Sequence, residues 1–351
     1  ITLKGGVSVY GGFAGEDMSE TPEGRNLEAD VTIFRGNNAY WRYGTGNNNV
    51  IRDGKQVYLW TDDTFNAPDP TPEEVYWKPN AAGRLINSTG ETATGEKIVL
   101  DGILFSAACV RTGKNPLEVR RCKFWGCYDD FGVIYCTTSF SVTDCEFWGS
   151  NGPMISSDSA TTSDSVLVSN VVMRSCSATN NGRGFGIYAP SVALTVSDCS
   201  FENNVTLGGS APFITGNDNS RFTIQNSVFR DIGVMGSATY LLWLPNYKAC
   251  VVSNCLFQSN RVVGDRGGSS TAVAGVVMAQ RTDHVIVDCS FVSNVVDRTE
   301  AVTKAGETTL KAAVIRSMYL APIRNCTFDG NRVSAVASDA SVTPLTARTE
   351  P

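Results

Sequence analysis

The sequence predicts an all-β fold in which short strands stack as the parallel coils of a solenoid. A recurring unit supports this prediction, and residues 285–294 show it in full: an apolar alternation, then Cys-x-Phe, then an Asn three residues after the Phe. The interval between consecutive units varies while the unit itself is kept, which is typical of a solenoid whose loops differ in length. A meander of β-hairpins would not place the same triplet at the same point of unit after unit.

We expect each unit to be one short strand with one buried face. Val285, Val287, Cys289 and Phe291 lie two residues apart, which is the period of a strand that packs on one side. Parallel stacking would place like residues about 4.8 Å apart. The predicted ladders of stacked side chains are a thiol ladder, an aromatic ladder and a ladder of turn asparagines: Cys122, Cys145, Cys199, Cys255, Cys289, Cys326; Phe124, Phe147, Phe201, Phe257, Phe291, Phe328; Asn204, Asn260, Asn294, Asn331. Asparagine suits the left-handed backbone of a turn and can form hydrogen bonds along a stack.

The Phe-x-x-Asn repeats resemble those of right-handed parallel β-helix proteins, including polymorphic outer-membrane proteins and autotransporter passengers. A second resemblance lies near the N-terminus, where Tyr10-Gly-Gly-Phe13 is followed by Arg25-Asn26 and by a strand at residues 31–34 closed by Gly36. This run is similar to the first coils of secreted bacterial β-helix proteins. The resemblance implies a right-handed parallel β-helix located outside the cell or at the bacterial cell surface. Proteins of this class include adhesins and lyases.

We predict a single β-helix domain over residues 1–340, with residues 37–96 as an inserted hairpin or flap and residues 341–351 as a linker-like tail. The chain opens within a strand pattern, so we interpret it as a mature protein or an excised fragment, with adjoining segments or further coils outside it. The insertion is rich in aromatic residues. These residues either pack the insertion against the side of the β-helix or cap its end, or they form a platform that stacks on sugar rings. These candidate ligand-binding residues are Trp41, Tyr58, Trp60, Tyr76 and Trp77.

Charge and composition exclude some classes of partner and bear on whether the cysteines form disulfides. The net charge of −6 and the lack of a Lys or Arg cluster argue against nucleic acid and anionic membranes as partners. No apolar run is long enough to span a bilayer. Six of the eleven cysteines occupy the repeated inward position, so we favour a core of free thiols over a disulfide framework.

The weak catalytic candidates are Asp129 and Asp130, adjacent carboxylates in a predicted turn. They invite comparison with the acidic sites of polygalacturonases and the calcium sites of pectate lyases. The Gly-His-Gly motif of the hydrolases is absent, however, and no Lys or Arg is placed to serve as a lyase base. A solvated turn is the simpler interpretation. The single histidine, His284, lies at the entrance to a strand, where we expect a turn residue. We predict no metal site and no cofactor, with calcium only if the protein is a lyase.

Two classes of function follow from these observations. The first is an exported, non-catalytic β-helix, either an adhesin or a structural passenger, that binds glycans or a surface protein. The alternative is a polysaccharide lyase or glycoside hydrolase acting in a β-helix groove. We favour the first because function must be argued from a site, and the sequence shows no convincing catalytic constellation.

Overall fold

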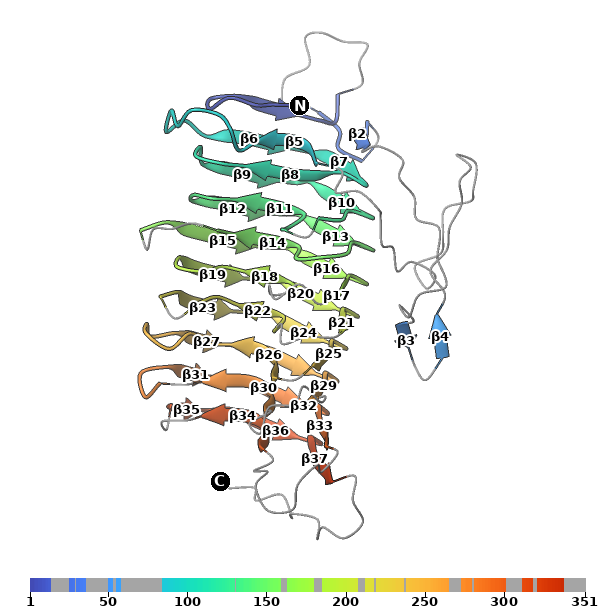
Figure 1. Ribbon diagram of the computed structural model, residues 1–351, viewed down its shortest axis with the longest axis vertical. Coiled ribbons are helices and arrows are strands. Elements are labelled where there is room, and N and C mark those ends of the chain that lie inside the picture. The colour runs from blue at the N-terminus through green and yellow to red at the C-terminus, as the bar shows by residue number, and fades with distance from the viewer. Residues whose placement is uncertain are drawn as a thin grey trace.

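The structure is a computed structural model. It describes residues 1–13, 25–28, 30–35, 50–52, 55–57, 84–129, 131–158, 163–179, 185–207, 212–217, 219–236, 238–264, 273–279, 281–300, 311–317 and 321–337. Within these residues the chain winds into a stack of coils that forms a rod, with β1 (Ser8–Tyr10) near one end and β37 (Arg332–Ala337) at the other (Figure 1). The strands of successive coils pair in parallel and build four sheets, here named A to D.

Sheets A and B run the length of the rod and have ten strands each. Sheet A contains, in spatial order, β1 (Ser8–Tyr10), β6 (Ile98–Asp101), β9 (Leu117–Arg120), β12 (Phe140–Thr143), β15 (Ser165–Ser169), β19 (Ala193–Ser197), β23 (Arg221–Gln225), β27 (Val251–Ser253), β31 (Val285–Val287) and β35 (Ile323–Arg324). Sheet B contains β2 (Thr32–Arg35), β7 (Ile103–Ser106), β10 (Lys123–Trp125), β13 (Glu146–Trp148), β16 (Val172–Arg174), β20 (Ser200–Glu202), β24 (Val228–Arg230), β28 (Leu256–Gln258), β32 (Ser290–Val292) and β36 (Thr327–Asp329).

Sheets C and D complete the coil. Sheet C contains β5 (Arg84–Ser88), β8 (Cys109–Thr112), β11 (Ile134–Cys136), β14 (Ile155–Ser157), β18 (Ile187–Tyr188), β22 (Ile214–Thr215), β26 (Ala238–Trp243), β30 (Val273–Ala279) and β34 (Lys311–Ser317). Sheet D contains β17 (Ser177–Thr179), β21 (Val205–Leu207), β25 (Gly233–Gly236), β29 (Arg261–Gly264), β33 (Val295–Glu300) and β37 (Arg332–Ala337). Within the insertion, β3 (Val50–Arg52) and β4 (Lys55–Val57) pair antiparallel as a hairpin.

The repeated unit forms two strands, so our expectation of one strand per unit is wrong. In the unit at 285–294, β31 ends at Val287, Asp288 takes a left-handed backbone with φ of 55°, and β32 begins at Ser290. This bend interrupts the alternation of faces. Ile286 therefore faces the core and is fully buried, whereas Val285 and Val287 are only half-buried.

The bend between sheets A and B recurs with the same geometry from coil to coil. The left-handed residues have φ between 50° and 57° and are mostly Asp or Asn: Arg121, Asp144, Asn170, Asp198, Asn226, Asn254, Asp288, Asn325. Asp and Asn tolerate this conformation better than other non-glycine residues. The residue that follows the bend points inward, and in most coils it is the cysteine of the repeat.

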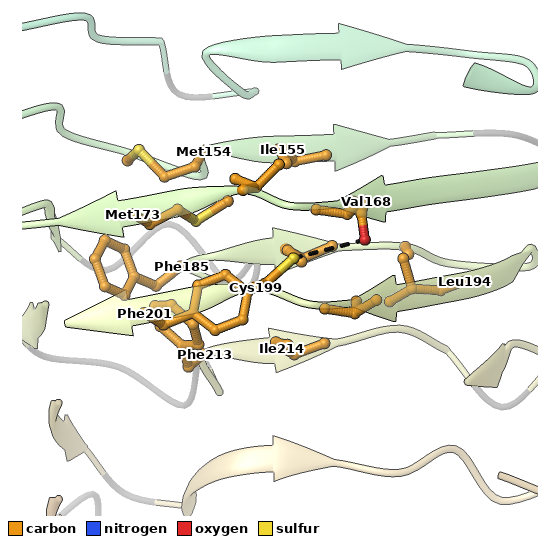
Figure 2. Close-up of a cluster of buried hydrophobic side chains, with 14 of the residues drawn as sticks. Met154, Ile155, Val168, Met173, Phe185, Leu194, Cys199, Phe201, Phe213 and Ile214 are labelled. Atoms are coloured by element: carbon orange, nitrogen blue, oxygen red, sulfur yellow. Dashed lines mark hydrogen bonds between the residues drawn. The ribbon is translucent and has the colours of Figure 1, made fainter. Parts of the chain in front are cut away.

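Like side chains stack on like inside the rod. Phe124 pairs with Phe147 in register, and their rings are stacked with centroids 4.8 Å apart. The same parallel stacking joins Phe257 to Phe291, at 4.7 Å. In the middle coils Phe213 of the sheet C side packs edge-on against Phe201, and the Cys199 thiol donates to the Val168 carbonyl of the preceding coil (Figure 2).

A buried asparagine ladder closes the end of sheet B. Asn294 accepts from the backbone N–H of Asn260 at 3.1 Å and donates from its amide nitrogen to the carbonyl of Phe257 at 2.8 Å. Asn331 repeats both contacts on Asn294 and Phe291. The left-handed residue lies one position earlier than expected, at Ser293 and not at the asparagine. The asparagine instead satisfies backbone groups that the bend removes from the sheet.

Replacing Asn294 with leucine should therefore be strongly destabilising. The change removes the acceptor of the Asn260 N–H and a donor to the Phe257 carbonyl in a buried setting, and we expect a loss of about 2–4 kcal/mol in unfolding free energy. Urea denaturation followed by circular dichroism measures the loss. Gln258→Ala, at the outward end of β28 in the same region, serves as the control and should cost less than about 0.5 kcal/mol. Equal losses in the two variants would contradict this role of the ladder.

Candidate functional site

The Asp129 side chain is buried in the β-helix and is not presented to solvent. Asp129 is 1% exposed, and its Oδ1 accepts the backbone N–H of Phe131 at 2.8 Å, which fixes the turn. Gly152 of the next coil approaches so closely that a Cβ there would lie 2.5 Å from the Asp129 carbonyl oxygen. These contacts give Asp129 a structural role in the turn. Asp130 lies outside the described residues.

An arginine lies beside this turn, where the sequence showed no Lys or Arg placed to serve as a lyase base. The Arg111 guanidinium lies between two aromatic rings, 4.4 Å from the centroid of Phe131 and 4.6 Å from that of Tyr135. The Tyr135 hydroxyl bonds to Asp158 at 3.2 Å, and burial raises the pKa of Tyr135. Arginine stays protonated in proteins, so Arg111 can attract an anion but cannot act as a general base.

All eleven cysteines are free thiols in the structure, and ten of them are buried. Those of the thiol ladder follow the bend and direct Sγ toward a carbonyl of the preceding coil, as Cys289 does toward Val252 at 3.6 Å. Burial raises the pKa of Cys176 to about 12 and that of Cys199 to about 11. These thiols therefore remain protonated at neutral pH and act as small apolar side chains, since the thiolate is the nucleophile and metal ligand.

The structure buries His284 completely, where we expected a turn residue. Its Nδ1 accepts the backbone N–H of Cys250 at 3.1 Å, so the imidazole satisfies a backbone group of the preceding coil. Burial lowers the pKa of His284, and Asp283, which is paired with Arg281, only partly opposes this effect. The histidine is therefore a neutral interior side chain.

A buried carboxylate near the N-terminal end holds three arginines. Asp101 accepts from Arg25 at 2.6 Å, Arg120 at 2.7 Å and Arg121 at 2.6 Å. Burial alone would raise the pKa of Asp101, but the hydrogen bonds from the three guanidinium groups outweigh it and hold the pKa below its usual value. Arg25 also lies over the ring of Tyr10 at 5.1 Å. This cluster fastens the segment at Arg25 to the first coils, a role that the sequence did not predict.

The outer face of sheet B carries a stacked tryptophan pair that the sequence analysis missed. Trp125 and Trp148 end consecutive strands, pair in register and stack with ring centroids 5.8 Å apart and an angle of 11° between planes. Each follows an inward phenylalanine by one residue, so it lies on the opposite face of the sheet. The signal was present: two consecutive units read Cys-x-Phe-Trp. Both rings are half-buried.

Charged side chains continue this outer face along the rod. Lys123 and Glu146 pair in register beside the two tryptophans, and Glu146 forms an ion pair with Arg174, whose side chain is 53% exposed. Arg174 occupies the register position after Trp148, and Glu202 and Arg230 follow it. We name Trp125, Trp148, Lys123, Glu146 and Arg174 the sheet B platform. It combines aromatic surface with exposed cations on a regular, rigid sheet.

The predicted ligand-binding aromatics of the insertion, Trp41, Tyr58, Trp60, Tyr76 and Trp77, lie outside the described residues. In the described part of the chain, no three His, Cys, Asp or Glu side chains come close enough together to hold a metal ion. That part also contains no helix with the length and apolar character needed to cross a membrane.

Comparison with known proteins agrees with this architecture. Residues 103–229 match the family model described as a right-handed beta helix region. The fold is a right-handed parallel β-helix. The match covers the coils that contain the Asp129 turn and the sheet B platform, and the same parallel sheets continue beyond it to β35 and β36. Curated proteins give no significant match to the chain.

The buried histidine predicts a specific pH dependence of stability. Because the pKa of His284 is lowered in the folded β-helix, the unfolded chain binds more protons as pH falls below about 6.5. The stability from the neutral imidazole is thus complete above that pH and declines as the pH falls toward the lowered value. Urea unfolding of the native protein and of His284→Gln at a series of pH values measures this. The native protein should lose more stability than the variant on acidification, and identical slopes would contradict the assignment.

Proposed function

We propose that this β-helix is an exported, non-catalytic protein, found outside the cell or at the bacterial cell surface, that binds a glycan or a surface partner as an adhesin or structural passenger. The observation that supports binding most directly is the sheet B platform. Its stacked Trp125 and Trp148 present apolar ring surface, and ring surface suits the C–H faces of sugars as well as the side chains of a protein partner. The exposed Lys123 and Arg174 favour a ligand that carries carboxylate or sulfate groups.

The geometry of the sheet favours an extended ligand. Successive strands of sheet B present equivalent outward positions at a spacing of about 4.8 Å along the rod. A linear polysaccharide lying along the axis would meet the tryptophans first and then the charged positions Arg174, Glu202 and Arg230. The platform is built on regular strands and so is already ordered before binding, which reduces the entropic cost of association.

Three buried ionisable groups that could have been catalytic candidates have structural partners instead. Asp129 is committed to its turn, His284 to a backbone N–H, and Asp101 to three arginines. None of the three is presented to solvent as a general acid or base would be. The lyase or hydrolase alternative would require a general acid or base other than these three, with Asp130 as the remaining sequence candidate, and would bring calcium only in the lyase case.

Binding to a panel of neutral, uronate-containing and sulfated polysaccharides tests the proposal. The double variant Trp125→Ala, Trp148→Ala should bind its glycan at least about ten-fold more weakly, because two aromatic anchors are lost. Tyr247→Ala, an exposed aromatic outside sheet B, is the matched control and should bind as the native protein does. Trp60→Ala and Trp77→Ala report on the insertion. Circular dichroism confirms that each variant is folded.

The same panel tests the alternative function. Product analysis with calcium and with chelator detects chain cleavage, and cleavage would overturn the non-catalytic assignment. Retention that is unchanged in the Trp125, Trp148 double variant but lost in Trp60→Ala or Trp77→Ala would move the site to the insertion. Failure to bind any glycan, together with no capture of a surface protein by the native β-helix, would contradict the binding role.

A further inference from the structure

Three consecutive strands of sheet C place polar side chains side by side on its outer face. Asn87 on β5 pairs in register with Arg111 on β8, and Arg111 pairs with Tyr135 on β11. Their neighbours along the strands, such as Val110 and Thr112, are fully buried on the inner face. The three strands follow one another down the rod (Figure 1). An amide, a guanidinium and a phenol therefore form one outward row, with a spacing of about 4.8 Å from strand to strand.

The Arg111 guanidinium lies against aromatic rings and not against a carboxylate. Its central carbon is 4.4 Å from the centroid of Phe131 and 4.6 Å from that of Tyr135, and the two rings stand at 82° to each other. Its Nε is buried and has no hydrogen-bond partner. No carboxylate in the described part of the chain forms an ion pair with Arg111. A guanidinium has five N–H donors and a permanent charge, so this one can still take an anion.

Both rings are fixed by contacts with other residues. The Phe131 N–H donates to the buried Asp129 at 2.8 Å, which sets the turn that carries the Phe131 ring. The Tyr135 hydroxyl bonds to Asp158 at 3.2 Å. The corner in which Arg111 lies is therefore built before any ligand arrives, and this reduces the entropic cost of binding.

Asn87 adds a second donor beside the guanidinium. Its side chain is exposed, and its Oδ1 accepts the Thr89 hydroxyl at 3.0 Å, which leaves the amide nitrogen to donate elsewhere. The two oxygens of a carboxylate are satisfied by the fork of one guanidinium. A further donor on the next strand suits an anion with a third oxygen, which a sulfate or phosphate group has and a carboxylate lacks.

The charge of Asp158 distinguishes between these two anions. Asp158 is exposed and lies one hydrogen bond beyond Tyr135, so it faces the same corner as Arg111. A phosphate monoester carries a charge of about −1.5 to −2 at neutral pH, whereas a sulfate ester carries a single negative charge. Repulsion from Asp158 grows with the charge of the ligand, and Arg111 supplies only one positive charge. The balance of charge favours the monoanion.

We propose that Asn87 and Arg111 bind a sulfate ester of a sulfated glycan on the outer face of sheet C. The guanidinium would donate to two sulfate oxygens and the Asn87 amide to the third. The half-buried Phe131 ring offers apolar surface to the sugar that carries the sulfate. This site lies on a different sheet from the sheet B platform and does not depend on binding there.

Nuclear magnetic resonance titration with hexoses that share one ring tests the proposal: glucose, glucose 6-sulfate, glucose 6-phosphate and glucuronate. The native protein should bind glucose 6-sulfate about five-fold more tightly than the other two anions, and glucose not measurably. Arg111→Gln should weaken sulfate binding about ten-fold or more, because a charge-assisted bidentate contact is lost. Asn87→Ala should weaken sulfate binding about five-fold and leave glucuronate binding unchanged, because only the third oxygen loses its donor.

Three further variants serve as controls. Lys114→Gln removes one positive charge from an exposed position in the same coil, and it should bind glucose 6-sulfate as the native protein does. The Trp125, Trp148 double variant should also retain this binding, because its change is on sheet B. Asp158→Asn should narrow the difference in affinity between the phosphate and the sulfate, because it removes the repulsive charge.

Several results would overturn the proposal. One is a native protein that does not bind glucose 6-sulfate, and another is binding that persists unchanged in a folded Arg111→Gln. If circular dichroism shows that Arg111→Gln does not fold, Asn87→Ala decides, and unchanged sulfate binding in it contradicts the site. Tighter binding of glucuronate than of the sulfate would identify a carboxylate site instead. Inorganic sulfate that binds as tightly as glucose 6-sulfate would rule out a role for the sugar.

Discussion

The structure depends on the in-register parallel stacking of one coil on the next. Each inward side chain lies on a side chain of similar kind, so the core is a set of ladders and not a single mixed interior. The left-handed bend after sheet A makes this possible, because it turns the chain sharply and resets which residues face inward. Without the same bend in successive coils, Cys289 could not lie on Cys255, nor Phe291 on Phe257. The asparagine ladder then satisfies the backbone groups that the bends leave out of the sheets.

Residues on the inner face of each sheet and residues on its outer face therefore have different roles. Groups that would be reactive in other settings are structural here when they lie inside: the Cys176 and Cys199 thiols are protonated, His284 is neutral, and Asp129 holds a turn. The outer positions are free to vary because they do not set the register. Sheet B shows this freedom most clearly, since the same outward position holds Trp148 in one coil and Arg174 in the next. A ligand is therefore most readily recognised on the outer surface.

The sequence predicted the fold because ladders of like residues leave a direct trace, the repeated Cys-x-Phe and Phe-x-x-Asn. It did not reveal the bend within the unit, since alternating apolar residues such as Val285 and Val287 imitate a continuous strand. Trp125 and Trp148 were missed because they directly follow the Cys-x-Phe triplet, and only the triplet was compared from unit to unit. The Asp101 cluster joins Arg25 to residues far along the chain, and no local pattern encodes such a contact. The aromatic candidates of the insertion stay a prediction.

The most direct test of this account uses the native cysteines, which sample the core coil by coil. The protein is treated with an alkylating reagent at about pH 8, near the pKa of a free thiol, and modified peptides are followed by mass spectrometry. The account predicts that Cys326, the one cysteine that is not fully buried, reacts first, and that Cys176, Cys199 and the other buried thiols react only on unfolding. Reaction of Cys199 or Cys289 as fast as Cys326, or disulfides between neighbouring coils, would contradict the in-register stacking of the ladders.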